Sequence, residues 1–156
     1  NVNSKFKKYF FNQYYCPHVP FNFHRSIKKI ANTSIDISDG LISDMSKLIN
    51  KQKLSFEIDI NKIPISNMLR SYLIKYNKKK DRYLFNGDDY QILFTSTKKN
   101  RKLIKNFSRK MNQKITIIGK INKRFKKNLL LLDNKPIILD NKPINIVNFQ
   151  GYSHKF

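Results

Sequence analysis

The stretch from Ser34 to Asn50, SIDISDGLISDMSKLIN, changes its apolar spacing from every second residue to helical intervals. In SIDIS the isoleucines alternate with polar residues, as in a half-buried strand. Beyond Gly40 the apolar residues fall at the intervals of one helix face: Leu41, Ile42, Met45, Leu48 and Ile49. The polar residues are expected to lie off that face: Ser43, Asp44, Ser46 and Lys47. The sequence therefore predicts a strand, a turn and an amphipathic helix.

The same two periodicities recur along the chain and predict interleaved helices and strands. Helices are expected within 22–34, over 66–76 and from an N-cap at Thr97 to about Met111. The last of these should carry three apolar side chains inward: Leu103, Ile104 and Phe107. Strands are expected at 54–60, 90–96, 114–121 and 128–139, with a hairpin turn at DNKP (133–136). This order predicts an α/β (α+β) fold with a mixed β-sheet packed with helices.

The chain is strongly basic, with 32 Lys and Arg against 10 Asp and Glu and a formal net charge of +22 over 156 residues. Lysine is spread along the whole chain, and Asn and Ile are enriched with it, which is typical of compositional drift. The positive field favours anionic small molecules such as nucleotides. No specific nucleic-acid partner is expected, although a basic nucleic-acid-binding module remains an alternative.

Cysteine usage and hydropathy bear on the cellular location of the chain and on membrane association. No run of eighteen apolar residues is present, so no membrane partner is expected. Cys16 is the only cysteine, which excludes a disulfide within the chain and favours a reducing, cytoplasmic location. Cys16, His18 and His24 lie close in sequence but lack the second ligand pair of a zinc site.

The acidic residues are concentrated rather than scattered. Five of the ten lie in two short motifs: Asp36, Asp39, Asp44, Asp88 and Asp89. In the first motif, Asp36 and Ser38 share one face of the predicted strand, and Asp39 begins the turn into the helix. Backbone N–H groups at a helix start favour phosphate, and carboxylates there can hold Mg²⁺, as a metal-bound nucleotide requires.

Structural roles are alternatives for the same residues. Asp39 could cap the helix, and Asp36 could pair with a lysine. The segment NGDD, residues 86–89, could form an ordinary turn.

Five motifs in order resemble the C-terminal half of the thiamine-monophosphate kinase family, within the superfamily of aminoimidazole ribonucleotide synthetase. They are SIDISDGLISD (34–44), INKIPIS (60–66), GDDYQILF (87–94), IIGKI (117–121) and GYSHKF (151–156). The resemblance implies ATP-dependent phosphorylation of thiamine phosphate to thiamine diphosphate. It also implies that residues 15–156 form the C-terminal ATP- and substrate-binding domain and that residues 1–14 are the remnant of an inter-domain segment.

The resemblance also implies roles for individual residues. Asp36 and Asp39 would bind Mg²⁺, Ser38 would contact ATP, and Asp88 and Tyr152 would contact thiamine phosphate. No residue is assigned as a catalytic acid, base or nucleophile.

Some features depart from the family pattern or lie beyond this chain. Many relatives carry Glu at the position of Asp88, and Lys155 separates His154 from Phe156 in the C-terminal motif. The family's N-terminal domain is expected to be absent from this chain, which alone should then be inactive. The full-length protein is expected to form a homodimer. An ATP-using member of the superfamily with another acceptor remains an alternative.

Overall fold

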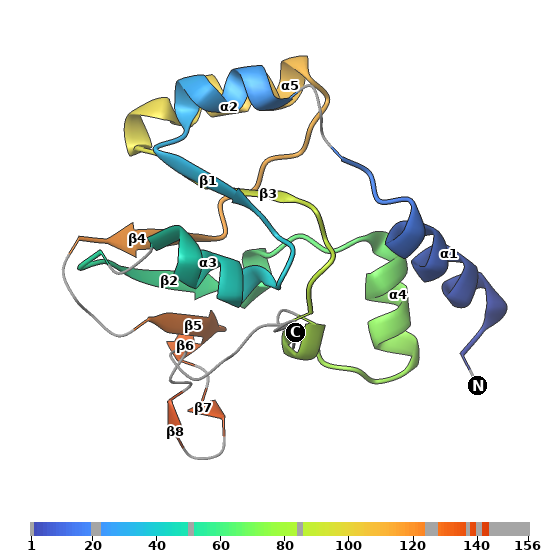
Figure 1. Ribbon diagram of the computed structural model, residues 1–156. Coiled ribbons are helices and arrows are strands. Elements are labelled where there is room, and N and C mark those ends of the chain that lie inside the picture. Colours follow the sequence, from blue (N-terminus) through green and yellow to red (C-terminus); the bar gives the residue numbers. More distant parts are fainter. Residues whose placement is uncertain are drawn as a thin grey trace, which may run out of the picture.

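The structure, a computed structural model, describes residues 2–19, 23–49, 52–83, 86–123, 128–136, 138–139 and 142–143. Helices and strands are interleaved along the chain (Figure 1). The α-helices are α1 (Ser4–Tyr15), α2 (His24–Ile30), α3 (Leu41–Ile49), α4 (Asn67–Lys75) and α5 (Arg101–Lys110). Short 3₁₀ helices are η2 (Ile60–Lys62), η3 (Lys80–Tyr83) and η4 (Lys98–Asn100). None of the described helices is long and apolar enough to cross a membrane.

Within the described residues, the strands form one mixed sheet and two smaller antiparallel pairs. In the sheet, β2 (Ser55–Asp59) pairs antiparallel with β4 (Gly119–Asn122) and parallel with β5 (Leu129–Leu132). Strand β6 (Lys135–Pro136) closes the expected hairpin on β5. The two pairs are β1 (Thr33–Asp36) with β3 (Ile92–Thr95), and β7 (Ile138–Leu139) with β8 (Lys142–Pro143). The predicted α+β architecture with a mixed sheet is confirmed.

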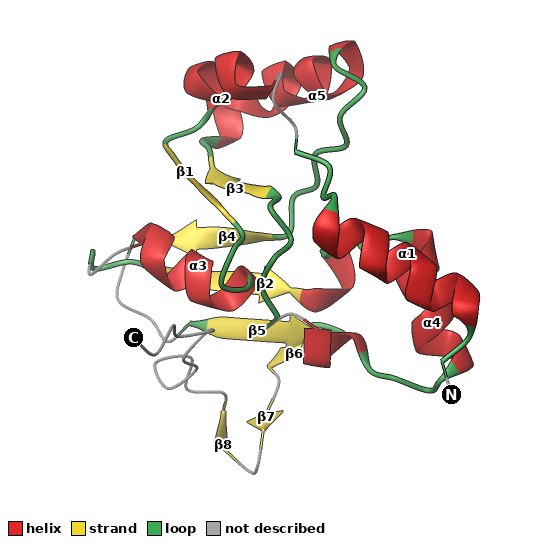
Figure 2. Ribbon diagram, turned by 45° about the vertical axis from the view of Figure 1, so that its right-hand side comes forward, coloured by secondary structure: helices red, strands yellow, loops and turns green. Residues whose placement is uncertain are grey.

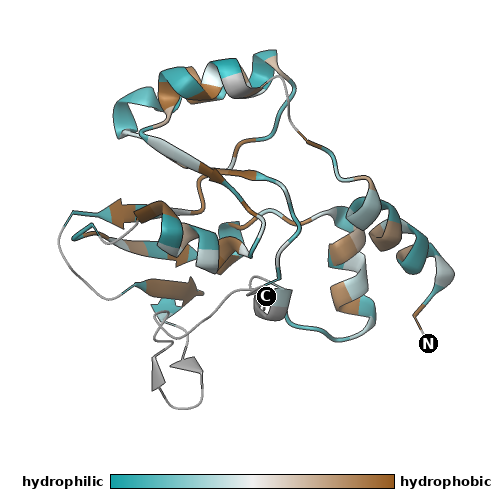
Figure 3. Cartoon of the chain, in the orientation of Figure 1, coloured by the Kyte–Doolittle hydropathy of each residue, from teal (hydrophilic) through white to brown (hydrophobic). Residues whose placement is uncertain are grey.

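The core lies between α3 and the mixed sheet (Figure 2). The most deeply buried apolar side chains of this core are Phe56, which is 0% exposed, and Ile58, Ile60 and Ile42, which are each 1% exposed. Figure 3 shows apolar residues along β2, β4 and β5 and alternating polar and apolar residues on α3. Burial of this α3 face stabilises the segment that carries the first acidic motif.

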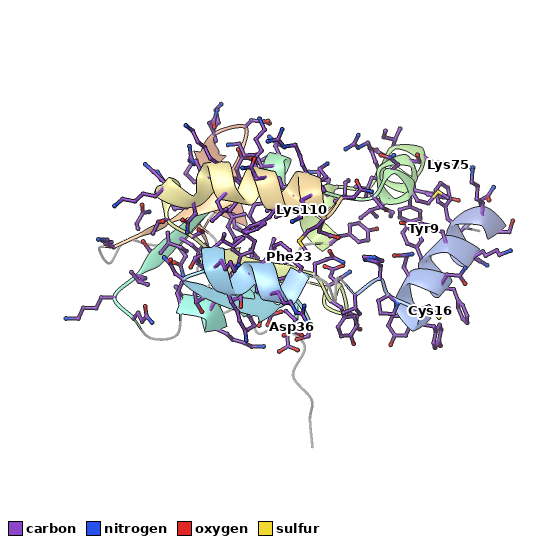
Figure 4. The ribbon with its side chains drawn as sticks, turned by 90° about the horizontal axis from the view of Figure 1, so that it is seen from above. Tyr9, Cys16, Phe23, Asp36, Lys75 and Lys110 are labelled. Carbon is purple, nitrogen blue, oxygen red and sulfur yellow. The ribbon has the colours of Figure 1, made fainter. Side chains whose placement is uncertain are left out.

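Two helix pairs flank the sheets. Helices α2 and α5 lie side by side, as Figures 1 and 4 show. Helix α1 packs on α4 through aromatic rings: Phe6 is 7% exposed, and its ring centroid lies 5.5 Å from Tyr72 and 6.0 Å from Tyr76. The N-terminal segment is therefore held by edge-to-face aromatic contacts.

Three details of the sequence prediction are wrong. Asp44 was expected off the buried face of its helix, yet it is 0% exposed, because its carboxylate accepts hydrogen bonds from the preceding turn. Leu103 is 39% exposed rather than inward. The strand expected from residue 114 begins only at Gly119. Thr97 is the N-cap residue of η4, which α5 follows directly, but its side chain makes no capping hydrogen bond.

We expect the buried β2 residue Ile58 to contribute far more to stability than the exposed Ile74. Replacing Ile58 by Ala should lower the free energy of unfolding by about 2–5 kcal/mol, because a cavity remains in the core. The same change at Ile74, which is 77% exposed, should cost less than about 0.5 kcal/mol. Urea unfolding followed by circular dichroism measures both, and equal losses would contradict the described core.

Candidate functional site

The two acidic motifs meet at one end of the β1–β3 pair, where β1 ends and β3 begins. Because these strands are antiparallel, Asp36 at the end of β1 lies opposite Ile92 at the start of β3. The backbone pairing continues beyond the strands. Ile37 N–H donates to the Gln91 carbonyl at 2.9 Å, and Tyr90 N–H donates to the Ile37 carbonyl at 2.9 Å. Residues about fifty positions apart in sequence are therefore adjacent.

Glycine is required where the second motif crosses the first. A Cβ atom on Gly87 would lie 2.0 Å from the carbonyl oxygen of Ser38, closer than any real contact. The next residue, Asp88, donates its N–H to that same carbonyl at 2.9 Å. Gly40, which closes the turn into α3, has φ 110°, a backbone conformation that side chains other than glycine rarely adopt. Gly87 thus allows the close approach of the two motifs, and Gly40 allows the turn into α3.

Asp44 organises the turn between β1 and α3. Its carboxyl oxygen Oδ2 accepts hydrogen bonds from the backbone N–H groups of Ser38 at 3.0 Å and Asp39 at 2.9 Å. Its other oxygen, Oδ1, accepts from Nζ of Lys47 at 2.9 Å. No role for Asp44 was expected from the sequence. The available signal was an acidic residue in the first turn of a helix directly after an Asp-Gly turn.

Lys47 connects Asp44 to Asp39. Its ammonium group forms ion pairs with both carboxylates. The hydrogen bond to Asp39 is the main reason that the pKa of Lys47 is raised, and the hydrogen bond to Asp44 is the second. A lysine ion pair was considered for Asp36; among the ion pairs of the described residues, the lysine partner in this motif belongs to Asp39 and Asp44. Asp44 holds the turn that precedes α3, because it binds the backbone N–H groups of Ser38 and Asp39. Asp39 remains partly accessible, with 28% of its side chain exposed.

The loop that carries Asp88 has an unusual backbone. Asp88 has φ 64° and Tyr90 has φ 49°, both in the left-handed region, which is uncommon for a residue as bulky as tyrosine. The Tyr90 hydroxyl donates to Oδ1 of Asp88 at 3.1 Å, and this hydrogen bond raises the pKa of Tyr90. Dehydration by surrounding protein, with a contribution from Asp88, raises the pKa of the Asp89 carboxyl. Backbone strain of this kind is typical of functional loops.

The second motif lines an open cleft, and the first motif flanks it. Described lining residues include Tyr14, Ile37, Gly87, Asp88 and Asp89. Asp36 and Asp39 are not among these lining residues.

The backbone of these two residues nevertheless adjoins residues that line the cleft. Asp36 directly precedes Ile37, and Asp39 directly follows Ser38, against which Gly87 packs. Asp36 is exposed, and Figure 4 shows its carboxylate at the edge of the chain. The structure thus brings Asp36, Ser38, Asp39 and Asp88 into one region, whereas Tyr152 lies outside the described residues.

The donor set bears on the expected Mg²⁺. Among the residues that the structure describes, no three His, Cys, Asp or Glu side chains gather as a metal site. Asp36 and Asp39 supply carboxylate oxygens, the ligands that Mg²⁺ prefers, and Asp39 already accepts the cationic group of Lys47. Two carboxylates fit a Mg²⁺ that completes its coordination with phosphate oxygens and water, as is usual for this ion.

We expect Asp44→Ala to destabilise the chain by about 3 kcal/mol, because two partly buried N–H groups lose a charged acceptor. Asp36→Ala is the matched control, since Asp36 belongs to the same motif but is exposed. Its unfolding free energy should change by less than about 0.5 kcal/mol. Chemical unfolding measures both variants, and a neutral Asp44→Ala would show that the turn does not depend on this carboxylate.

We expect Asp88→Asn to lower the pKa of Tyr90 toward the ordinary tyrosine value, because the hydrogen bond to a carboxylate favours the neutral phenol. In the wild-type protein Tyr90 should therefore ionise at higher pH than in the variant. Absorbance at 295 nm, corrected by subtracting a Tyr90→Phe titration, isolates this residue. Circular dichroism verifies that the protein remains folded, and superimposable Tyr90 titrations would disprove the contact.

Comparisons with known proteins agree on one family. No family model matches the chain. It is 38% identical over 124 residues to a thiamine-monophosphate kinase of Buchnera aphidicola subsp. Schizaphis graminum, covering 77% of this chain and 37% of that relative. It is 43% identical over 83 residues to a thiamine-monophosphate kinase of Aquifex aeolicus, covering 53% of this chain and 27% of that relative.

A solved structure shows the same fold. The structure of AaThiL complexed with AMPPCP and TMP matches with a TM-score of 0.68 and 30% identity, covering 88% of this chain and 41% of that one. The chain thus spans well under half the length of the proteins that it matches. By sequence and by fold, it belongs to the thiamine-monophosphate kinase family.

Proposed function

We propose that this chain is the C-terminal half of a kinase that transfers a phosphoryl group from ATP to thiamine phosphate, producing thiamine diphosphate. The observation that carries the proposal is the meeting of the motifs at 36–39 and 87–90 beside one cleft. The names of the curated relatives support it. The complex of a structural relative with AMPPCP, an ATP analogue, and TMP supports the two substrates.

Asp36 and Asp39 are proposed to hold Mg²⁺, and Ser38 is proposed to contact ATP. Phosphoryl transfer depends mainly on positioning and on neutralising phosphate charge, and bound Mg²⁺ supplies the neutralisation. The chain's own contribution is a rigid turn. Ser38 is held on both sides, since its N–H donates to Asp44 and its carbonyl accepts from Asp88. These hydrogen bonds fix the backbone from which Ser38 and the neighbouring Asp39 project.

Asp88 is proposed to bind the thiamine substrate from the other side of the same turn. Asp88 lines the cleft, and the Tyr90 hydroxyl orients its carboxylate through a hydrogen bond. A carboxylate in this position can accept hydrogen bonds from the amino group of a pyrimidine ring. Tyr152 is proposed to lie against that ring, as the family resemblance implies.

The chain is proposed to act within a longer protein. The relatives extend well beyond the matched part, and an N-terminal domain would supply further metal and ATP ligands. Residues 15–156 would be the C-terminal domain, and residues 1–14 the end of the connecting segment. A homodimer of the full-length protein and a cytoplasmic location belong to the same proposal.

We expect Asp36→Asn and Asp39→Asn each to lower kcat for thiamine diphosphate formation by about 100-fold or more, because each removes a charged metal ligand. The assay uses ATP, Mg²⁺ and thiamine phosphate with the protein encoded by the complete reading frame. Asp133→Asn is the matched control, because Asp133 is an exposed acidic residue in the β5–β6 turn with φ 52°, a conformation that asparagine tolerates.

Two outcomes would contradict the proposal. Undiminished turnover in both Asp variants would remove their assigned role. Preference for another acceptor, such as a purine precursor, in a competition assay against thiamine phosphate would reassign the substrate within the superfamily.

A further inference from the structure

The ammonium group of Lys47 occupies a position between two carboxylates that come from different parts of the site. Asp39 belongs to the turn after β1, and Asp44 lies one helical turn before Lys47 on α3. Two other lysines in the described part of the chain also form ion pairs with acidic residues: Lys62 with Asp59 at 2.8 Å and Lys120 with Glu57 at 2.9 Å. Lys47 differs from them because it bridges two carboxylates, one of them fully buried.

We infer that the ammonium group of Lys47 occupies the Asp39 carboxylate when no metal is bound and that a divalent cation must displace it. Lys47 would thereby set the affinity of this site for divalent cations. The inference rests on the proposed role of Asp39 in metal binding. Without a metal, the single positive charge of Lys47 lies between two neighbouring carboxylates and reduces the repulsion between them. When a divalent cation binds Asp39, the ammonium group is repelled and leaves that carboxylate.

The surroundings of the three side chains allow this exchange to remain local. The Lys47 side chain is 47% exposed and flexible, so its ammonium group can move into solvent without disturbing the core. The Asp39 side chain is partly exposed and therefore reachable by a hydrated ion. Asp44 stays in place, because it is 0% exposed and holds two backbone N–H groups of the turn. The turn thus keeps its shape while the cation on Asp39 changes.

The direct test measures the chemical reactivity of Lys47 in the wild-type protein. The folded full-length protein is treated briefly with an amine-acylating reagent, with and without saturating Mg²⁺, and acylation at each lysine is quantified by mass spectrometry. We expect Lys47 to react several-fold faster with Mg²⁺, because its ammonium group is released from Asp39. Lys62 is the internal control, since its pair with Asp59 lies outside the site and its reactivity should not change. Equal reactivity of Lys47 in both conditions would overturn the inference.

A second test uses variants and Mn²⁺ alone as the probe, with bound and free ion distinguished by electron paramagnetic resonance. Lys47→Gln removes the charge but keeps a hydrogen-bond donor for Asp44, and it should tighten Mn²⁺ binding roughly tenfold by removing the competing cation. Lys62→Gln should leave the affinity unchanged. Adding Asp39→Asn to Lys47→Gln should abolish the gain.

The outcomes separate this inference from the proposed function. Mn²⁺ binding that depends on Asp39 but is equally tight with and without the Lys47 charge would overturn only the role of Lys47. Failure of Mn²⁺ to bind to the wild-type protein and to every variant would overturn both the role of Lys47 and the proposed metal site at Asp39.

Discussion

The candidate site depends on one buried carboxylate. Asp44 reaches back from the first turn of α3 and accepts the N–H groups of Ser38 and Asp39, which would otherwise be left without a partner as the chain leaves β1. A charged acceptor bound to two backbone donors is stronger than a neutral one, so the turn is held rigidly. The side chains proposed to contact ATP and metal therefore project from a fixed backbone.

The pairing of β1 with β3 connects this turn to the substrate loop. Their register places Asp36 opposite Ile92, and backbone hydrogen bonds extend the contact to Ser38 and Asp88. The absence of a side chain at Gly87 permits the crossing. A one-residue slip in this register would exchange the faces of the strands and move Asp36 away from the loop, so the proposed metal and substrate ligands depend on the same ladder.

In this basic chain, the acidic residues of the first motif differ in whether they pair with a lysine. In a chain of net charge +22, acidic residues readily form ion pairs with nearby lysines, and Lys47 pairs with both Asp39 and Asp44. Asp36, by contrast, lies exposed at the edge of the chain (Figure 4). The ion pairing is therefore selective. The buried Asp44, which shapes the turn, has a lysine partner, and that partner, Lys47, is exposed and can move.

The sequence by itself determined the order of helices and strands from α2 to β6, the mixed α+β architecture and the two acidic motifs, because apolar periodicity and turn residues are local signals. Helix α1 was not predicted from the sequence. The sequence also did not determine which acidic residue is structural. Periodicity placed Asp44 among the surface residues of α3, and only the tertiary structure shows it buried beneath the turn. Likewise, the pairing of Lys47 with Asp39 and the contact of Gly87 with Ser38 were decided by tertiary structure, since each joins segments whose approach depends on how the strands and helix pack.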